Sequence, residues 1–245
     1  MLRIFLTKTD IILFHPGMRL GGDNVKNVRK CYLDELQDIK ELINQMGNQT
    51  KLFVAEAVKA LVVFDIRRAE SVRHYERKID ALHREIEEKC IAVIATQQPV
   101  ASDLRFLIAS IKISTEIERI ADYANNITKI IHKKLSGLDM TPISHLSSVI
   151  DEMGSLAINM LVDTLSSYES TEHEFVAIAK ERDKAVNEAN AKLFKLMIDT
   201  GKRNGAIAQA LLELHTAVRY LERLADRTVN IAEWVFYMKT GYRYG

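Results

Sequence analysis

The sequence predicts an all-α fold: two tandem three-helix bundles related by internal duplication. Three observations support this prediction: turn residues are scarce, apolar residues recur at helical spacing over long stretches, and acidic motifs repeat in the two halves of the chain. The 245 residues include only 10 Gly and 3 Pro. That is too few for the many tight turns of a β-sandwich, a barrel or a doubly wound α/β fold.

The composition is that of a soluble globular protein, with 47% hydrophobic and 27% charged residues. Apolar clusters occur near the N-terminus, but Lys8 and Asp10 interrupt them before they reach the length of a signal peptide or a membrane span. The formal net charge of +1 offers no domain-wide basic field for nucleic acid or anionic lipid. We therefore expect no nucleic-acid partner and no direct membrane contact.

Residues 1–29 lack the pattern of the rest of the chain and form an N-terminal extension of unclear structure. Six helices follow, and Pro and Gly residues mark the breaks between them. They are predicted at 28–64, 68–95, 100–135, 143–167, 172–200 and 206–240. The first three make up one repeat, at 30–136, and the last three a second, at 142–240, with each half expected to bury its own apolar faces.

The third helix has the clearest core stripe, because its apolar residues step by three or four positions. These are Leu104, Leu107, Ile111, Ile117, Ile120, Ala124, Ile127 and Ile131. The two cysteines, Cys31 and Cys90, have no neighbour at metal-ligand or CxxC spacing. We expect both to be buried, reduced thiols in a cytosolic protein.

A repeat of acidic motifs relates the two halves. A shift of 104 residues lays Glu118-Arg119-Ile120-Ala121-Asp122 onto Glu222-Arg223-Leu224-Ala225-Asp226, and Asn126 onto Asn230. A shift of 107 places Glu76 on Asp183 and Asp80 on Asn187. This period is too long for a solenoid and fits the duplication of one bundle.

The repeated acidic residues are candidate ligands for a metal ion. Glu118 and Asp122 lie about 120° to 200° around the helix from the core stripe, together with Asn126. Like charges at i and i+4 cost an isolated helix about 0.2 to 0.5 kcal/mol, so their recurrence raises the case for a bound cation, with a merely solvated face as the alternative that stays open. Carboxylate and amide oxygens suit iron, manganese or magnesium. The predicted ligands are Glu76, Asp80, Glu118, Asp122, Asn126, Asp183, Glu222, Asp226 and Asn230.

Signatures of catalysis are absent from the sequence. The seven histidines are scattered without a triad-like or HExxH context, and no Gly-rich phosphate-binding loop occurs. A ferritin-like di-iron site would need two Glu-x-x-His motifs, and the nearest match is Asp80-x-x-His83. We therefore expect a protein that is not an enzyme.

The motifs together resemble one family. Gln98-Pro99-Val100-Ala101-Ser102-Asp103-Leu104-Arg105, followed by the duplicated ERxxD helix, is similar to PhoU, a family of bacterial phosphate-signalling regulators. The resemblance covers about residues 34–240. It implies two symmetric three-helix bundles whose E(D)xxxD motifs hold multinuclear metal clusters on the surface. Asn187 departs from that pattern, which has Asp at this position.

The resemblance also implies a function. PhoU-like proteins are cytoplasmic negative regulators of phosphate uptake and of the phosphate-starvation response. They act as non-catalytic adaptors between the ATPase subunit of a phosphate ABC transporter and a sensor histidine kinase, and we also expect a homodimer. Two alternatives stay open: an accessory protein of another phosphate transporter, and a metal-dependent enzyme that uses the carboxylate cluster.

Overall fold

The chain folds into a bundle of long helices. The computed structural model describes residues 3–6, 11–14, 22–168 and 175–244. Its α-helices are α1 (Gly22–Val63), α2 (Ile66–Ser71), α3 (His74–Gln97), α4 (Ala101–Ile130), α5 (Ser147–Ser167), α6 (Phe175–Arg203) and α7 (Ala208–Thr240). A π-helical turn, η1 (Ile131–Leu135), continues α4, and two 3₁₀ helices, η2 (Thr141–Leu146) and η3 (Gly205–Ile207), precede α5 and α7.

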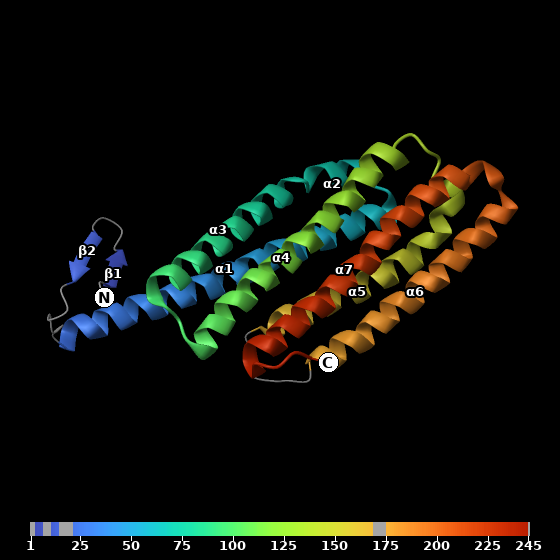
Figure 1. Ribbon diagram of the computed structural model, residues 1–245. Helices are drawn as coiled ribbons and strands as arrows, with labels where there is room; N and C mark the ends of the chain where they lie inside the picture. Colours follow the sequence, from blue (N-terminus) through green and yellow to red (C-terminus); the bar gives the residue numbers. More distant parts are fainter. Residues whose placement is uncertain (1–2, 7–10, 15–21, 169–174, 245) are drawn as a thin grey trace.

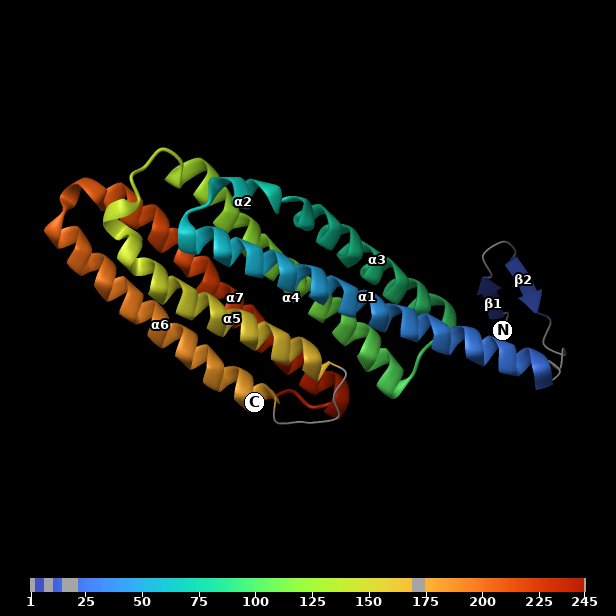
Figure 2. The ribbon, with the colours of Figure 1, turned by 180° about the vertical axis from the view of Figure 1, so that it is seen from behind.

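The predicted fold class is confirmed. Helices α1, α3 and α4 pack on one another as a first three-helix unit, and α5, α6 and α7 as a second (Figure 1). The expectation that each half buries its own apolar faces is wrong, because α4 packs extensively against α7 and α1 packs against α5 (Figure 2). Buried residues of both units form one continuous core. The division of the chain at residues 136 and 142 stays a prediction.

Helix α4 is buried on two sides, which makes its core face wider than the predicted stripe. Six of the eight stripe residues are buried, while Leu104 and Ile111 are only partly covered. A second set of buried positions is mostly small or polar, and two of them, Ser114 and Asn125, face α3 through hydrogen bonds with His83 and Glu76. This set includes Ala109, Ser110, Ile113, Ser114, Ala121, Asn125 and Thr128. A purely hydrophobic pattern does not show these positions.

Several helix ends differ from the prediction. The predicted second helix is broken between α2 and α3, and Asp65 caps α2 by accepting a hydrogen bond from the Arg68 backbone N–H at 3.0 Å. The predicted fourth helix begins with the 3₁₀ turn η2, and α6 continues past Gly201 to Arg203. The predicted start of the fifth helix, at residue 172, lies outside the described residues.

The predicted N-terminal extension contains regular structure. Strands β1 (Arg3–Leu6) and β2 (Ile11–Phe14) pair antiparallel, with Arg3 opposite Phe14 and Leu6 opposite Ile11. Helix α1 already begins at Gly22, and in both ribbon views its first turns extend beyond the other helices (Figures 1 and 2).

The two cysteines differ in exposure. Cys31 lies near the projecting end of α1 and is exposed, contrary to the prediction, whereas Cys90 of α3 is buried as expected. Among the described helices, none has both the length and the apolar character required to cross a membrane.

The segment from Gln98 to Arg105 connects three helices. Gln98 and Ala101 have φ angles of 50° and 43°, and this left-handed backbone turns the chain from α3 into α4. The hydroxyl of Tyr32 in α1 donates a hydrogen bond to the Asp103 carboxylate at 2.8 Å. The Arg105 guanidinium lies against Gly241, which ends α7 in a left-handed conformation. The segment thereby fixes the beginning of α4 relative to α1 and α7.

Candidate metal sites

The first acidic group consists of Glu76 and Asp80 on α3 and of Glu118 and Asp122 on α4, and it lies where these two helices pack on each other. Glu118 is half-buried and Asp122 is exposed, so both lie off the core as predicted. Burial, followed by the charges of Asp122 and Asp80, raises the pKa of Glu118. Burial and then the charge of Asp80 likewise raise the pKa of Asp122, although Lys129 opposes the shift. The fold therefore brings Asp80 of α3 into electrostatic contact with both carboxylates of α4.

Glu76 is held by partners that sequence reasoning did not find. Its Oε1 accepts a hydrogen bond from the side-chain amide of Asn125 and lies 3.9 Å from Lys129 Nζ. Asn125 is completely buried, and its own Oδ1 has no hydrogen-bond partner. The predicted ligand Asn126, one residue later, is only partly buried. The amide in contact with the acidic group is thus Asn125, on the side of α4 that the hydrophobic pattern assigns to the core.

The second acidic group consists of Asp183 on α6 and of Glu222 and Asp226 on α7, and it lies between these two helices. Burial and then Asp226 raise the pKa of Asp183, a hydrogen bond from Asn187 lowers it, and Glu222 raises it. The Asn187 amide donates to Asp183 Oδ2 at 3.1 Å, while Asp183 Oδ1 is buried without a partner. Asn190, which was not among the predicted ligands, donates to Glu222 Oε2 at 2.9 Å. The amides of Asn187 and Asn190 thus each donate to one carboxylate oxygen of this group, which leaves the other oxygens available to a cation.

Asn230 takes part in a different contact. Its side-chain amide donates to Glu116 Oε2 of α4 at 3.3 Å, and Arg227 donates to the same oxygen at 3.3 Å. Glu116 is only 8% exposed. The predicted ligand Asn230 therefore belongs, in this structure, to a polar network between α4 and α7.

The donors suit a hard cation in chemistry, although they do not converge fully. Within the described part of the chain, no three His, Cys, Asp or Glu side chains come close enough together to hold an ion. Burial, followed by the repulsion of neighbouring carboxylates, raises the pKa values of Glu118 and Asp183, and Asp183 Oδ1 is a buried acceptor without a donor. A cation would satisfy both features. Its binding requires carboxylates of the two helices to turn toward a common point.

An open groove of about 430 Å³ adjoins the second acidic group. Four residues of α7 and four of α6 line it. They are His215, Arg219, Glu222 and Asp226 on α7, and Asn187, Asn190, Ala191 and Phe194 on α6. The groove therefore runs from an acidic end to a basic and aromatic end.

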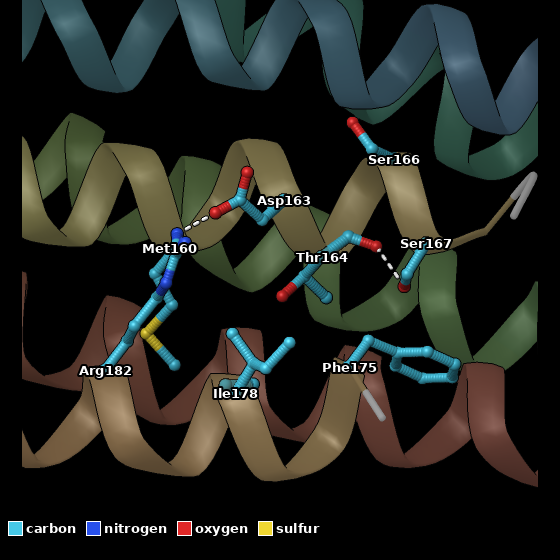
Figure 3. A pocket seen from close by; sticks show the side chains of 9 residues that line it. Met160, Asp163, Thr164, Ser166, Ser167, Phe175, Ile178 and Arg182 are labelled. Atoms are coloured by element: carbon cyan, nitrogen blue, oxygen red, sulfur yellow. Dashed lines mark hydrogen bonds and ion pairs between the residues drawn. The ribbon is translucent and has the colours of Figure 1, made fainter. Parts of the chain in front are cut away.

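A separate pocket of about 270 Å³ lies between the end of α5 and the beginning of α6 (Figure 3). Met160, Phe175 and Ile178 provide apolar contacts, and an ion pair joins Asp163 to Arg182. None of the predicted metal ligands lines this pocket.

The two helical units with acidic groups on their paired helices define the class of protein, and comparisons with known proteins agree. The family model described as the PhoU domain matches residues 43–131 and 150–235, once in each half. The chain therefore belongs to the PhoU family.

Relatives match over most of their length. The phosphate-specific transport system accessory protein PhoU homolog of Rhizobium meliloti is 30% identical over 216 residues, which cover 88% of this chain and 90% of the relative. The protein of the same description from Caulobacter vibrioides is 31% identical over 212 residues, covering 86% and 91%.

Solved structures agree with the fold. The crystal structure of PhoU from Pseudomonas aeruginosa matches with a TM-score of 0.80 at 26% identity, covering 86% of this chain and 100% of that one. The regulatory protein PhoU from Streptococcus pneumoniae matches with a TM-score of 0.75 at 24% identity, over 87% of this chain and 99% of that one, and supports the fold alone.

Proposed function

We propose that this protein is an accessory protein of a phosphate-specific transport system, acting as a negative regulator of phosphate uptake and of the phosphate-starvation response. The observation that carries the proposal is the family match in both halves, together with full-length relatives described as accessory proteins of that system. In this role the protein is a cytoplasmic, non-catalytic adaptor, and it works as a homodimer.

The adaptor role requires surfaces for two partners: the ATPase subunit of the transporter and a sensor histidine kinase. Several large apolar side chains are exposed on the long helices and near their ends, among them Ile91 of α3, Val100 before α4 and Leu212 of α7. Exposed apolar side chains of this kind supply the area that protein partners bury. They support a binding function.

Gene deletion tests the regulatory part of the proposal. Cells that lack the protein should express phosphate-starvation genes even in phosphate-rich medium, and a plasmid copy of the intact gene should restore repression. Unchanged expression in the deletion strain would refute the regulatory role.

Co-purification tests the adaptor part. The tagged full-length protein, isolated from phosphate-replete cells, should carry the transporter ATPase and the kinase with it, and light scattering should give the mass of a dimer. Recovery of a different phosphate transporter would favour the accessory role in another system. Recovery of neither partner would refute the adaptor role.

We also propose that the two acidic groups bind hard cations, namely iron, manganese or magnesium. The mutual repulsion of the carboxylates and the unpartnered Asp183 Oδ1 support this proposal. A bound cation supplies positive charge that offsets the repulsion between the carboxylates of neighbouring helices. Glu76, Asp80, Glu118 and Asp122 would hold it in the first group, and Asp183, Glu222 and Asp226 in the second, with amide oxygens as further ligands.

A further inference from the structure

We propose that the groove between α6 and α7 binds a small protonated oxyanion of the phosphate type, beside a cation held by Glu222 and Asp226. The inference rests on the cation binding proposed above and adds a second ligand to that site. Three features of the groove carry it: an available guanidinium and imidazole at one end, carboxylates at the other, and an unpartnered amide oxygen at its wall.

The basic end supplies donors for an anion. Arg219 is exposed and forms no ion pair within the part of the chain that the structure describes. The His215 ring packs against the ring of Phe194, with a centroid separation of 5.0 Å, and its Nδ1 is buried without a partner. Arginine and histidine donate strong, charge-assisted hydrogen bonds to oxyanions.

The acidic end makes anion binding conditional on a cation. Helix geometry places Arg219 about 4.5 Å from Glu222 along the axis of α7, and about 10 Å from Asp226. An anion near Arg219 therefore lies close to two carboxylates that repel it. A cation between Glu222 and Asp226 reverses this effect, because it attracts the oxygens that face away from Arg219. Anion binding should consequently follow cation binding.

Asn190 indicates which oxyanion fits. It lines the groove, its amide nitrogen is committed to Glu222, and its Oδ1 is a buried acceptor that receives no hydrogen bond. Once the Asn190 side chain turns this oxygen into the groove, a phosphate that carries a hydroxyl proton can donate to it, whereas sulfate at neutral pH cannot. The groove should therefore prefer phosphate to sulfate.

The first half of the chain lacks these groups at the equivalent positions. The 104-residue shift places Ile111 at the position of His215 and Thr115 at that of Arg219, and the 107-residue shift places Glu87 at that of Phe194. The basic end is thus a feature of the second half alone. We expect one anion for each chain.

Titration calorimetry on the full-length protein tests the proposal. Inorganic phosphate is titrated into the protein with and without saturating Mg²⁺, and sulfate and glycerol 3-phosphate are titrated in parallel. Phosphate should bind with one site per chain in the presence of Mg²⁺ and at least tenfold more weakly in its absence. Tighter binding of glycerol 3-phosphate than of phosphate would overturn the assignment to a free anion.

Variants identify the site. Arg219→Ala and Arg219→Gln should each weaken phosphate binding about 10- to 100-fold, since they remove a charge-assisted hydrogen bond, and should leave Mg²⁺ affinity unchanged or slightly higher. Arg223→Ala is the matched control, because Arg223 is exposed on the same helix, contacts the Tyr220 ring and does not line the groove. It should change phosphate affinity less than twofold.

Four results would overturn the inference: no phosphate binding at saturating Mg²⁺, equal affinity with and without Mg²⁺, equal affinity for sulfate, or unchanged affinity in both Arg219 variants. The first of these, obtained with a protein that binds Mg²⁺ and complements the deletion strain, would overturn this inference while leaving the proposed function intact.

Discussion

Glu116 of α4 and Arg227 of α7 form an ion pair with a separation of 3.3 Å across the contact between the two halves of the molecule. The 104-residue shift carries Glu116 to Tyr220, and it carries Tyr123 to Arg227. Tyr123 and Tyr220 also touch, with ring centroids 5.7 Å apart. The ion pair and the aromatic pair are therefore equivalent positions of the repeat, on two helices that run in opposite directions (Figure 1).

Removing Arg227 should destabilise the protein more than the loss of a typical surface ion pair, although the Arg227 side chain is partly exposed. In Arg227→Met the Glu116 carboxylate, whose side chain is 10% exposed, keeps only Asn230 and the weaker contact to Arg119 as partners. The expected loss is about 2 to 3 kcal/mol in urea unfolding, because a mostly buried charge loses its main counter-charge. The double variant Glu116→Gln/Arg227→Met should recover part of this loss. Additive effects of the two substitutions would mean that the pair is not coupled.

Gly154 should not tolerate a methyl group. A Cβ at this position of α5 would lie 2.3 Å from Val58 Cγ1 of α1, and Val58 is buried. Gly154→Ala gains about 1 kcal/mol of helix propensity but forces α1 and α5 apart, so we expect a net loss of about 1 to 2 kcal/mol. Gly205→Ala is the control, since a Cβ there meets nothing within 4 Å. Equal melting temperatures of the Gly154 variant and the wild type would contradict the close approach.

The first acidic group should bind Mn²⁺ more tightly than the second. It offers four carboxylates, whereas Asn187 leaves three in the second group, and carboxylate number sets much of the affinity for hard cations. Calorimetry on the metal-free wild type should resolve two classes of sites, and Glu118→Ala/Asp122→Ala should abolish the tighter class.

A charge-matched control completes this experiment. Glu85→Ala/Glu88→Ala removes two exposed carboxylates of α3 that lie outside the acidic group, and it should leave both classes in place. The metal-free Glu118→Ala/Asp122→Ala variant should melt at the same temperature as the wild type or higher, because mutual repulsion is relieved. Identical binding curves for wild type and variant would show that these carboxylates are only a solvated face. A large fall in melting temperature would show that they contribute to packing.

The two thiols should differ sharply in reactivity. Burial, with a smaller contribution from Glu87, raises the pKa of Cys90 to about 12, so that only about one part in ten thousand is thiolate at pH 8. A thiol-exchange reagent should modify one cysteine of the native protein, Cys31, and both after denaturation. Rapid modification of two thiols in the native protein would contradict the burial of Cys90.

The same thiol predicts a dependence of stability on pH. The folded pKa of Cys90 is raised, so its contribution to stability is complete below the unfolded pKa near 9 and is lost as the pH rises from about 9 toward 12. The wild type should therefore lose stability faster than Cys90→Ala over this range in urea unfolding. Parallel pH profiles of the two proteins would refute the assignment.

The helices and the repeat can be predicted from the sequence because each produces a regular spacing of residue types. Apolar spacing gives α4, and the recurrence of Glu118 and Asp122 at Glu222 and Asp226 gives the internal symmetry. The same recurrence relates Asp80 to Asn187, and so predicts which helices share an acidic surface. These features need no knowledge of tertiary contacts.

The remaining features depend on tertiary contacts that no regular spacing in the sequence indicates. Asn125 is an ordinary polar residue in the sequence, and only the packing of α3 on α4 brings it to Glu76. The small and polar buried positions of α4 are covered because α4 packs against α1, α3 and α7 at once. Asn230 fits the acidic motif by spacing, yet the α4–α7 contact directs its amide to Glu116.

The unlike pairs at the α4–α7 contact restrict how the halves can associate. If two copies of the first half docked in the register now used by α4 and α7, Glu116 of each would meet Tyr123 of the other, and a nearly buried carboxylate would keep only the partly exposed Arg119 of its own helix as a counter-charge. Two copies of the second half would place Arg227 against Tyr220, without an acidic partner. Each half is therefore matched to the other and mismatched to itself, so self-association of equal halves carries an electrostatic penalty that the joined chain avoids.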